Sequence, residues 1–175
     1  MKMKIRQRVL VSLLCCIVFF VLPPIACTSG ANTINPPPSQ SVSGLVEKLT
    51  LDDLAARANL ILLGEAIDVV YQKEANDSIY TLVTFSVEQI FKGEIADEVV
   101  IRVPGGKLDG QIQVVEDSPS FQLGEEAVVF LEKGDGISRV FGGSQGKFTI
   151  DNNNMVSGNI PLQEFVEQVR NAITN

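Results

Sequence analysis

The stretch Ile79-Tyr-Thr-Leu-Val-Thr-Phe-Ser-Val-Glu-Gln-Ile-Phe91 is the clearest structural signal in the sequence. Apolar and polar side chains alternate along it, as is typical of a β-strand with one buried face. The side chains expected on that face are Ile79, Val83, Phe85, Val87 and Phe91. A strand of this length is usually curved or bulged, and it can serve two sheets or wrap a barrel.

Further strands are expected on both sides of this one. The apolar run 59–71 predicts a largely buried strand, and the polar segment 72–78 predicts the turn that follows it. Alternation or short apolar runs predict strands at 98–103 and 127–132, and weaker ones at 111–115, 138–141 and 147–150. A hairpin tip is expected at 152–154, with Met155 and Val156 on its return.

Helices are expected at the two ends of this β region. Thr50 can cap a short helix with Asp52 and Asp53 in its first turn. Pro161 suits the first position of a second helix, whose apolar residues recur at helical spacing. Consecutive strands joined by turns between two helices favour a mainly β fold, with an antiparallel sheet or small barrel of five to six strands.

The N-terminus predicts export from the cytoplasm. Four of the first eight residues are basic, and the apolar run Val9–Leu22 follows them. This combination is typical of a secretory signal. Ala26-Cys27 resembles the lipobox of bacterial lipoproteins, although Pro24 stands where that motif usually has Leu. The resemblance implies a signal peptide at 1–26 and a lipid-attachment site at Cys27. The second alternative is a secreted protein that is cleaved nearby. The third is an uncleaved transmembrane anchor, for which the apolar run is shorter than the roughly 20 residues that a spanning helix needs.

The mature chain expected after this cleavage has a linker and a single domain. Residues 27–44 carry no charge and are rich in Pro and Ser, which predicts a disordered spacer, and residues 45–175 form the domain. The mature chain keeps 10 basic and 21 acidic residues and one cysteine, so no internal disulfide can form. Its net negative charge argues against nucleic acid as a partner. The sequence has no His, which excludes His-based catalysis and His metal ligands.

Three segments together resemble the pattern of uncharacterised secreted bacterial β domains. They are residues 57–65, 84–93 and 121–131, and they are also similar to the netrin-like modules of the tissue inhibitors of metalloproteinases. The resemblance implies an OB-like barrel with flanking helices. Those inhibitors act through a disulfide-held N-terminal Cys that meets a metal. Here the one mature Cys has no partner and precedes the linker, so these inhibitory residues do not carry over.

Two glycine-rich loops are the candidate binding loops. One contains Gly105 and Gly106, and the other contains Gly142, Gly143, Ser144 and Gln145. The second loop lacks the spacing and the Ser or Thr of a phosphate loop, so close approach of two backbones is the alternative for it. The carboxylates Glu65, Asp68, Glu125 and Glu126 lie beside apolar segments, but their spacing selects no catalytic pair.

The sequence predicts no catalytic residues, no cofactor and no metal ligands. The function it favours is an extracytoplasmic binding module, tethered to the membrane through Cys27 or secreted, whose partner is a protein or a component of the cell envelope. Two alternatives are a netrin-like protease inhibitor and a cell-envelope hydrolase that uses carboxylates alone. The sequence identifies neither the partner nor the oligomeric state.

Overall fold

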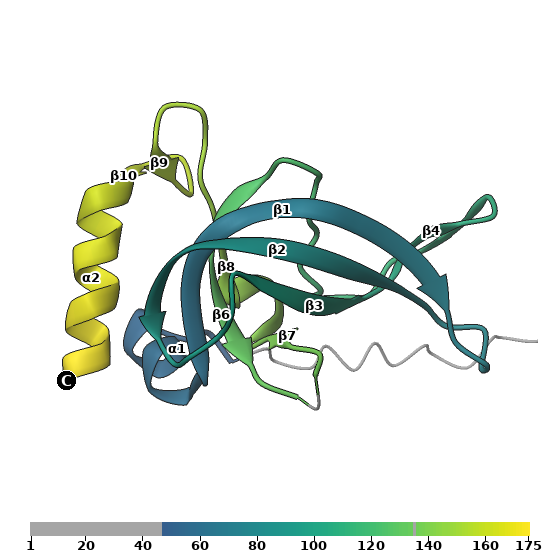
Figure 1. Cartoon of the computed structure of the whole chain (residues 1–175), viewed down its shortest axis with the longest axis horizontal. Coiled ribbons are helices and arrows are strands. Elements are labelled where there is room, and N and C mark those ends of the chain that lie inside the picture. Colours follow the sequence, from purple (N-terminus) through teal and green to yellow (C-terminus); the bar gives the residue numbers. More distant parts are fainter. Residues whose placement is uncertain (1–46, 135) are drawn as a thin grey trace, which may run out of the picture. The chain divides into compact units, whose positions relative to one another are not determined.

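A computed structural model of the chain describes residues 47–134 and 136–175. The predicted signal segment, Cys27 and the predicted linker lie outside these residues. The described part is mainly β, with antiparallel sheets, a short first helix and a C-terminal helix (Figure 1). The helices are α1 (Leu51–Arg57) and α2 (Leu162–Thr174), and the 3-10 turn is η1 (Gly143–Gly146). Neither α1 nor α2 is long and apolar enough to cross a membrane.

The main sheet has the strand order β3-β2-β1-β6-β7, and β8 also pairs with β6. Its strands are β1 (Leu60–Lys73), β2 (Ile79–Lys92), β3 (Glu98–Pro104), β6 (Glu126–Glu132), β7 (Arg139–Val140) and β8 (Lys147–Thr149). Two small hairpins pair β4 (Gly106–Leu108) with β5 (Gln111–Gln113), and β9 (Met155–Val156) with β10 (Ile160–Pro161). The β4–β5 hairpin lies at the end of the sheet that is remote from α2 (Figure 1).

The outer strand β3 also contacts the segment that leads into β7. Ile101 and Ser138 form a parallel bridge. The amide of Arg102 donates to the Ser138 carbonyl at 2.8 Å, and the Ser138 amide donates to the Val100 carbonyl at 2.9 Å. The two outer strands of the sheet, β3 and β7, therefore lie close together where β3 bridges to Ser138, the residue before β7.

The middle of the sheet is buried on both faces. Leu60 and Leu62 on β1 join one apolar cluster with the inward side chains of β2 and β3, whereas Ile61 and Leu63 join a second cluster. Strand β6 divides its side chains between the same two clusters. Successive strand residues point to opposite faces, so a continuous apolar run is the pattern that burial on both faces requires.

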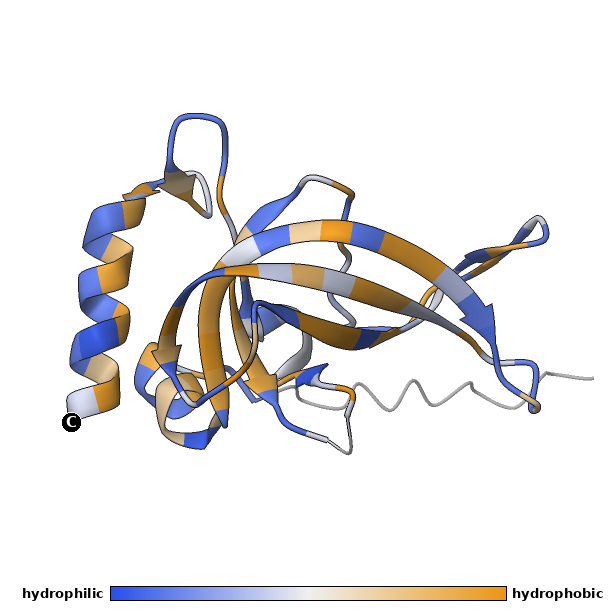
Figure 2. Ribbon diagram, viewed as in Figure 1, coloured by the Kyte–Doolittle hydropathy of each residue, from blue (hydrophilic) through white to orange (hydrophobic). Residues whose placement is uncertain are grey.

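Both helices cover the second cluster. Thr50 caps α1, as the sequence predicts, and the structure adds that Thr50 and Asp53 exchange a reciprocal pair of hydrogen bonds. On α2, Phe165, Val169 and Ala172 are buried against the sheet, and the opposite helix face is hydrophilic (Figure 2). The Phe165 ring lies 4.7 Å from that of Phe148, measured between centroids. Burial of this stripe, rather than intrinsic helix propensity, fixes α2 in place.

One predicted face is wrong at its end. Phe91 packs on the helix-covered cluster, whereas Val83 and Phe85 belong to the other one. The β1–β2 ladder shifts register between Ile61 and Leu62, and again between Leu63 and Gly64. Each extra residue in β2 reverses which face the following side chains occupy. A Cβ at Gly64 would overlap the Ser86 carbonyl oxygen, so the second irregularity needs glycine there.

Two further expectations need correction. The segment that contains Gly106 forms strand β4, which the polar composition of residues 104–119 did not indicate. Pro161 precedes α2 as its N-cap residue and pairs with Met155, so the helix begins one residue later than predicted. Proline can occupy this edge position because its missing N–H is not needed by the short ladder.

The aromatic stack beneath α2 gives a first prediction. We expect Phe165→Ala to lower the free energy of unfolding by about 3–5 kcal/mol, because a buried ring is lost and a cavity remains. Urea unfolding followed by circular dichroism measures this change. The exposed neighbour Glu167→Ala should change it by no more than about 0.5 kcal/mol. Equal losses in the two variants would contradict the packing described for α2.

Candidate functional site

A cavity of about 220 Å³ lies between the β1–β2 hairpin and the β4–β5 hairpin. Tyr71 on β1 and Thr81 on β2 form one side, and Gly105 and Gly106 follow from the end of β3. The opposite side is formed by residues 112 and 113 of β5 and by residues 114 and 115, which follow that strand. Phe121 also lines the cavity. Most of these contributions are apolar side chains or backbone, so the site suits an apolar group.

The two glycines allow the chain to pass close to β1 and β2. The Gly105 amide donates to the Ile79 carbonyl at 2.9 Å, and the Gly105 carbonyl accepts from the Thr81 hydroxyl at 2.7 Å. Gly106 has a φ of +147°, and a Cβ on it would lie 2.6 Å from the Tyr71 ring. Only glycine combines this backbone conformation with this close approach. The glycine at position 106 therefore lets the Tyr71 ring, which forms one wall of the cavity, lie directly against the backbone.

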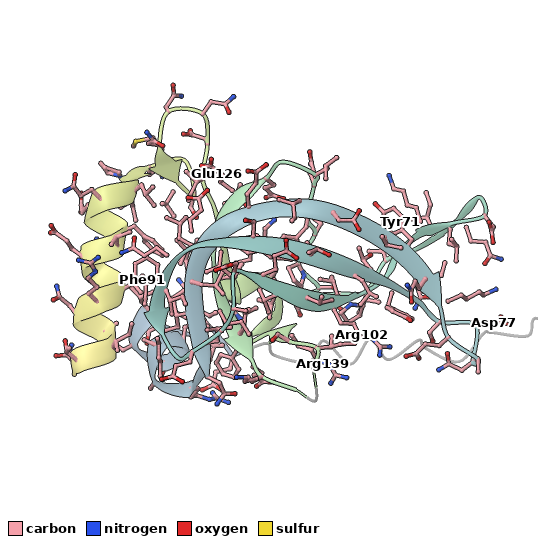
Figure 3. The ribbon with its side chains drawn as sticks, viewed as in Figure 1. Tyr71, Asp77, Phe91, Arg102, Glu126 and Arg139 are labelled. Carbon is pink, nitrogen blue, oxygen red and sulfur yellow. The ribbon has the colours of Figure 1, made fainter. Side chains whose placement is uncertain are left out.

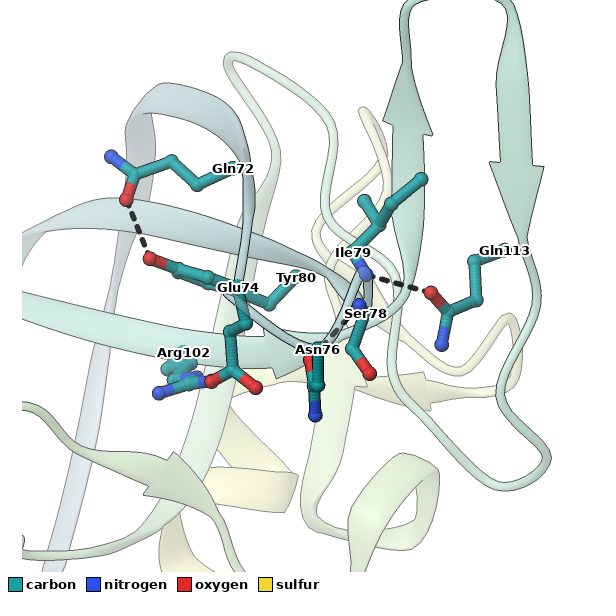
Figure 4. Close-up of polar contacts among 8 residues, drawn as sticks. All are labelled: Gln72, Glu74, Asn76, Ser78, Ile79, Tyr80, Arg102 and Gln113. Carbon is teal, nitrogen blue, oxygen red and sulfur yellow. Dashed lines mark hydrogen bonds and ion pairs between the residues drawn. The ribbon is translucent and has the colours of Figure 1, made fainter.

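Polar contacts at the tip of the β1–β2 hairpin attach the β4–β5 hairpin to the sheet (Figure 4). The Ile79 amide donates to the side-chain oxygen of Gln113 at 2.6 Å. The Tyr80 hydroxyl donates to the side-chain oxygen of Gln72, also at 2.6 Å. Within the turn, the Ser78 amide donates to the side-chain oxygen of Asn76 at 3.0 Å. Gln113 thus fixes the position of the cavity's outer wall relative to β2.

Arg102 supports the same end of the sheet from outside. Its guanidinium lies 4.1 Å from the centroid of the Tyr80 ring and forms an ion pair with Glu74 (Figure 4). Arg139 also lies on this side, near Arg102 (Figure 3). Three further hollows share these two arginines. The cation–π contact and the ion pair both hold the hairpin tip against β3.

A nearly buried ion pair supports the wall that contains Phe121. The Lys147 ammonium donates to a Glu125 carboxylate oxygen at 2.6 Å, and the two side chains are 8% and 15% exposed. The same ammonium donates to the Ser120 carbonyl and lies 4.4 Å from the centroid of the Phe121 ring. Lys147 therefore links β8 to the chain that forms this side of the cavity.

Hydrogen bonds determine the charge of Glu125. Burial raises its pKa, but this effect is outweighed by hydrogen bonds from Lys147, Thr149 and the Gln122 amide, so the pKa falls below its ordinary value of 4.5. Glu125 is therefore ionised at neutral pH and held by three donors. A carboxylate in this state is a poor general acid, which disfavours Glu125 as the general acid of carboxylate-dependent hydrolysis.

Large apolar side chains are exposed around the cavity mouth. Ile112 is 67% exposed, Val114 is 86% exposed and Tyr71 is 38% exposed. All three line the cavity. Scattered exposed apolar residues are normal, but a group of them beside an apolar cavity is typical of an interaction site.

The structure separates the two predicted glycine loops. Gly105 and Gly106 line the cavity, whereas Gly142, Gly143, Ser144 and Gln145 do not. The Gln145 side chain accepts from the Leu49 amide at 2.9 Å and donates to the Glu47 carbonyl at 3.0 Å. The Ser144 amide donates to the Asp117 carbonyl at 2.7 Å. The second loop thus fastens the chain before α1 and the turn after β5, while Gly143 borders a separate hollow.

Two of the four candidate carboxylates, Glu125 and Glu126, line another hollow, together with Asp151. Asp151 accepts hydrogen bonds from the amides of Asn153 and Met155, both at 2.9 Å, so it stabilises its own turn. Glu65 pairs across the ladder with Glu126, and Asp68 is exposed further along β1. Within residues 47–134 and 136–175, no group of three or more Asp, Glu or Cys side chains is arranged to hold a metal ion.

The ion pair gives a prediction for acid conditions. We expect Glu125→Gln to be less stable than the wild type at pH 7, because Lys147 then loses its carboxylate partner. Since the folded pKa of Glu125 lies below 4.5, its stabilising effect is complete above that pH and is lost as pH falls through the folded pKa. Thermal unfolding from pH 7 to pH 3 should show the two proteins converging. Glu126→Gln, at an exposed neighbouring position, is the control; a gap that stays constant with pH would contradict the assignment.

Several cavity residues escaped the sequence analysis. Ile112 and Val114 were expected only as part of a weak strand, and Gln113 carried no recognisable motif. Lys147, which supports the wall with Phe121 but does not line the cavity, belonged to the glycine-rich stretch that failed as a phosphate loop. The alternation at 111–115, without a charged or proline residue, was the signal that could have marked an exposed edge.

Comparison with known protein families and curated proteins found no match: the sequence matches no family model and no curated protein.

Proposed function

We propose that this protein is a non-catalytic, extracytoplasmic binding module, tethered to the membrane through a lipid on Cys27. Its partner is a protein or another component of the cell envelope, and binding takes place at the cavity between the two hairpins. The observation that carries the proposal is the pairing of an apolar cavity with the exposed side chains of Ile112 and Val114. Exposure of such side chains is unfavourable in water, so a complex in which a partner covers them is stabilised by the burial of apolar surface.

We also propose that the domain is an OB-like barrel. The parallel bridge between Ile101 and Ser138, which connects β3 at one end of the strand order with the residue before β7 at the other, supports this architecture. The apolar cluster that contains Phe85, Ile101 and Val129 is the interior expected of a small barrel, since its side chains come from β1, β2, β3 and β6. The cavity then lies at one end of the barrel, where loops and hairpins commonly bind ligands.

The binding function is tested by capture of a partner from cell-envelope extracts. We expect the full chain to retain a reproducible partner, and Val114→Asp to reduce the retained amount at least about tenfold, because a charge must then be desolvated at the interface. Mass spectrometry with a glycan array identifies and quantifies what is bound. Leu123→Asp is the matched control, since Leu123 is 71% exposed and does not line the cavity. Equal capture by both variants would disprove binding at this cavity.

The membrane tether is tested separately. We expect Cys27→Ser to release the protein from the membrane fraction into the soluble fraction, because no acyl chain can then be attached. Immunoblotting of the two fractions measures the distribution, and Cys16→Ser within the apolar run serves as the control. Retention of the Cys27→Ser protein in the membrane fraction would contradict lipid attachment at this residue.

A further inference from the structure

Strand β5 has one edge without a partner strand among the described residues. Its other edge pairs with β4, and Leu108 opposite Gln111 closes a two-residue turn in which Asp109 and Gly110 have φ values of +50° and +77°. Residue pairs in an antiparallel ladder alternate between hydrogen-bonded and non-bonded positions. The main-chain groups of Ile112, the next residue after Gln111, therefore point away from β4, and Val114 lies one residue beyond the end of β5.

The edge of β5 is short, which is one of the ways in which natural sheets limit pairing at an edge, but it lacks the other protective features. These are Lys, Pro, a bulge or a covering loop. Residues 111–115 contain neither Lys nor Pro, and the side chains of Ile112 and Val114 project from alternate positions into solvent. No hydrogen bond connects the main chain of Ile112 or Val114 with described residues beyond the β4–β5 ladder. The edge thus offers both backbone groups and apolar contacts to an added strand.

Charge determines which strand fits. Asp109 precedes the edge, and Glu116 and Asp117 follow it. If two copies of the chain paired antiparallel through this edge, centred on Gln113, Asp109 of each copy would lie opposite Asp117 of the other. Like charges directly opposite each other destabilise a pair of strands. A segment with basic residues at both ends meets the opposite charge at each end instead.

The size of the neighbouring cavity further limits the kinds of ligand that this site can take. Sites for small molecules usually enclose about 300–1,000 Å³. The cavity beside β5 has about 220 Å³, which favours a side chain contributed by a larger partner over a complete small molecule.

We propose that the outer edge of β5 binds, by strand addition, an extended segment of a partner protein that carries apolar residues at alternate positions between two basic residues. One apolar side chain of this segment enters the cavity next to Tyr71. Backbone hydrogen bonds to Ile112 and Val114 supply affinity, and the cavity and the acidic ends supply specificity. This inference rests on the proposed function, because it identifies the kind of partner that the same cavity takes.

The probe is the capped, fluorescein-labelled peptide Lys-Gln-Val-Thr-Val-Thr-Gln-Lys. In an extended chain, alternate amides face the same edge, so N-methylation of both Val residues removes donors from one edge and N-methylation of both Thr residues removes them from the other. We expect the parent peptide to bind the full chain, and one methylated isomer to bind at least about tenfold more weakly than the other, since two hydrogen bonds are lost. Fluorescence anisotropy measures the affinities.

The acidic ends have their own control. The double variant Asp109→Asn with Glu116→Gln should bind the Lys-flanked peptide several-fold more weakly, because two opposite charges are lost. Its affinity for a Ser-flanked version of the peptide should be unchanged. Asn is chosen for position 109 because it tolerates the positive φ there. The proposal is overturned if the parent peptide does not bind, or if the two methylated isomers bind equally. It is also overturned if the full chain forms a dimer that Val114→Asp dissolves. Capture of an envelope partner that depends on Val114 would still support the proposed function after any of these results.

Discussion

Burial of β1 and β6 on both faces is the constraint on which the rest of the structure depends. Leu60–Leu63 and Val128–Leu131 supply side chains to both apolar clusters, so hydrophobicity alone does not select which set points to which side. The register is fixed where the apolar runs end. Gly64 pairs with Ala127, which leaves room for close contact, and Glu65 pairs with Glu126 toward solvent. A shift by one residue would exchange these positions and bury a carboxylate.

This central pair of strands separates two regions with different physical chemistry. Around α2, aromatic and aliphatic side chains pack closely, and Phe130, Phe148 and Phe165 form a continuous series of rings. At the remote hairpins, the β4–β5 hairpin is held by polar contacts such as that of Gln113. The first region is closely packed, whereas the second leaves apolar surface uncovered. Binding sites are commonly built this way, on loops positioned by a rigid scaffold.

The sequence predicted the strands whose pattern is set by burial and missed those set by contacts between distant segments. The alternation at 79–85 and 99–103 matches the buried positions of β2 and β3, and the capping box at Thr50 and Asp53 is local in sequence. Phe91 was assigned to the wrong face because a bulge depends on the neighbouring strand, which periodicity along one strand does not reveal.

The candidate site was predictable only in part, for the same reason. The glycines at 105 and 106 indicated an unusual turn, but their use becomes clear only when Tyr71, far away in sequence, lies against them. The second glycine loop carried an equally strong local signal and serves to fasten the chain before α1. Local composition identifies a strained or close-packed turn, whereas the tertiary contacts decide whether that turn borders a cavity.

The β4–β5 hairpin contributes no side chain to either apolar cluster. Its attachment depends on Gly105, Gly106 and the Gln113 side chain, and its turn needs residues that tolerate a positive φ at positions 109 and 110. Ile112 and Val114 are mostly exposed and take no part in this attachment, so substitutions at these two positions can alter recognition and new specificities can accumulate on an unchanged scaffold. The same independence makes this hairpin the natural position at which to diversify the sequence in a library, with the rest of the domain kept constant.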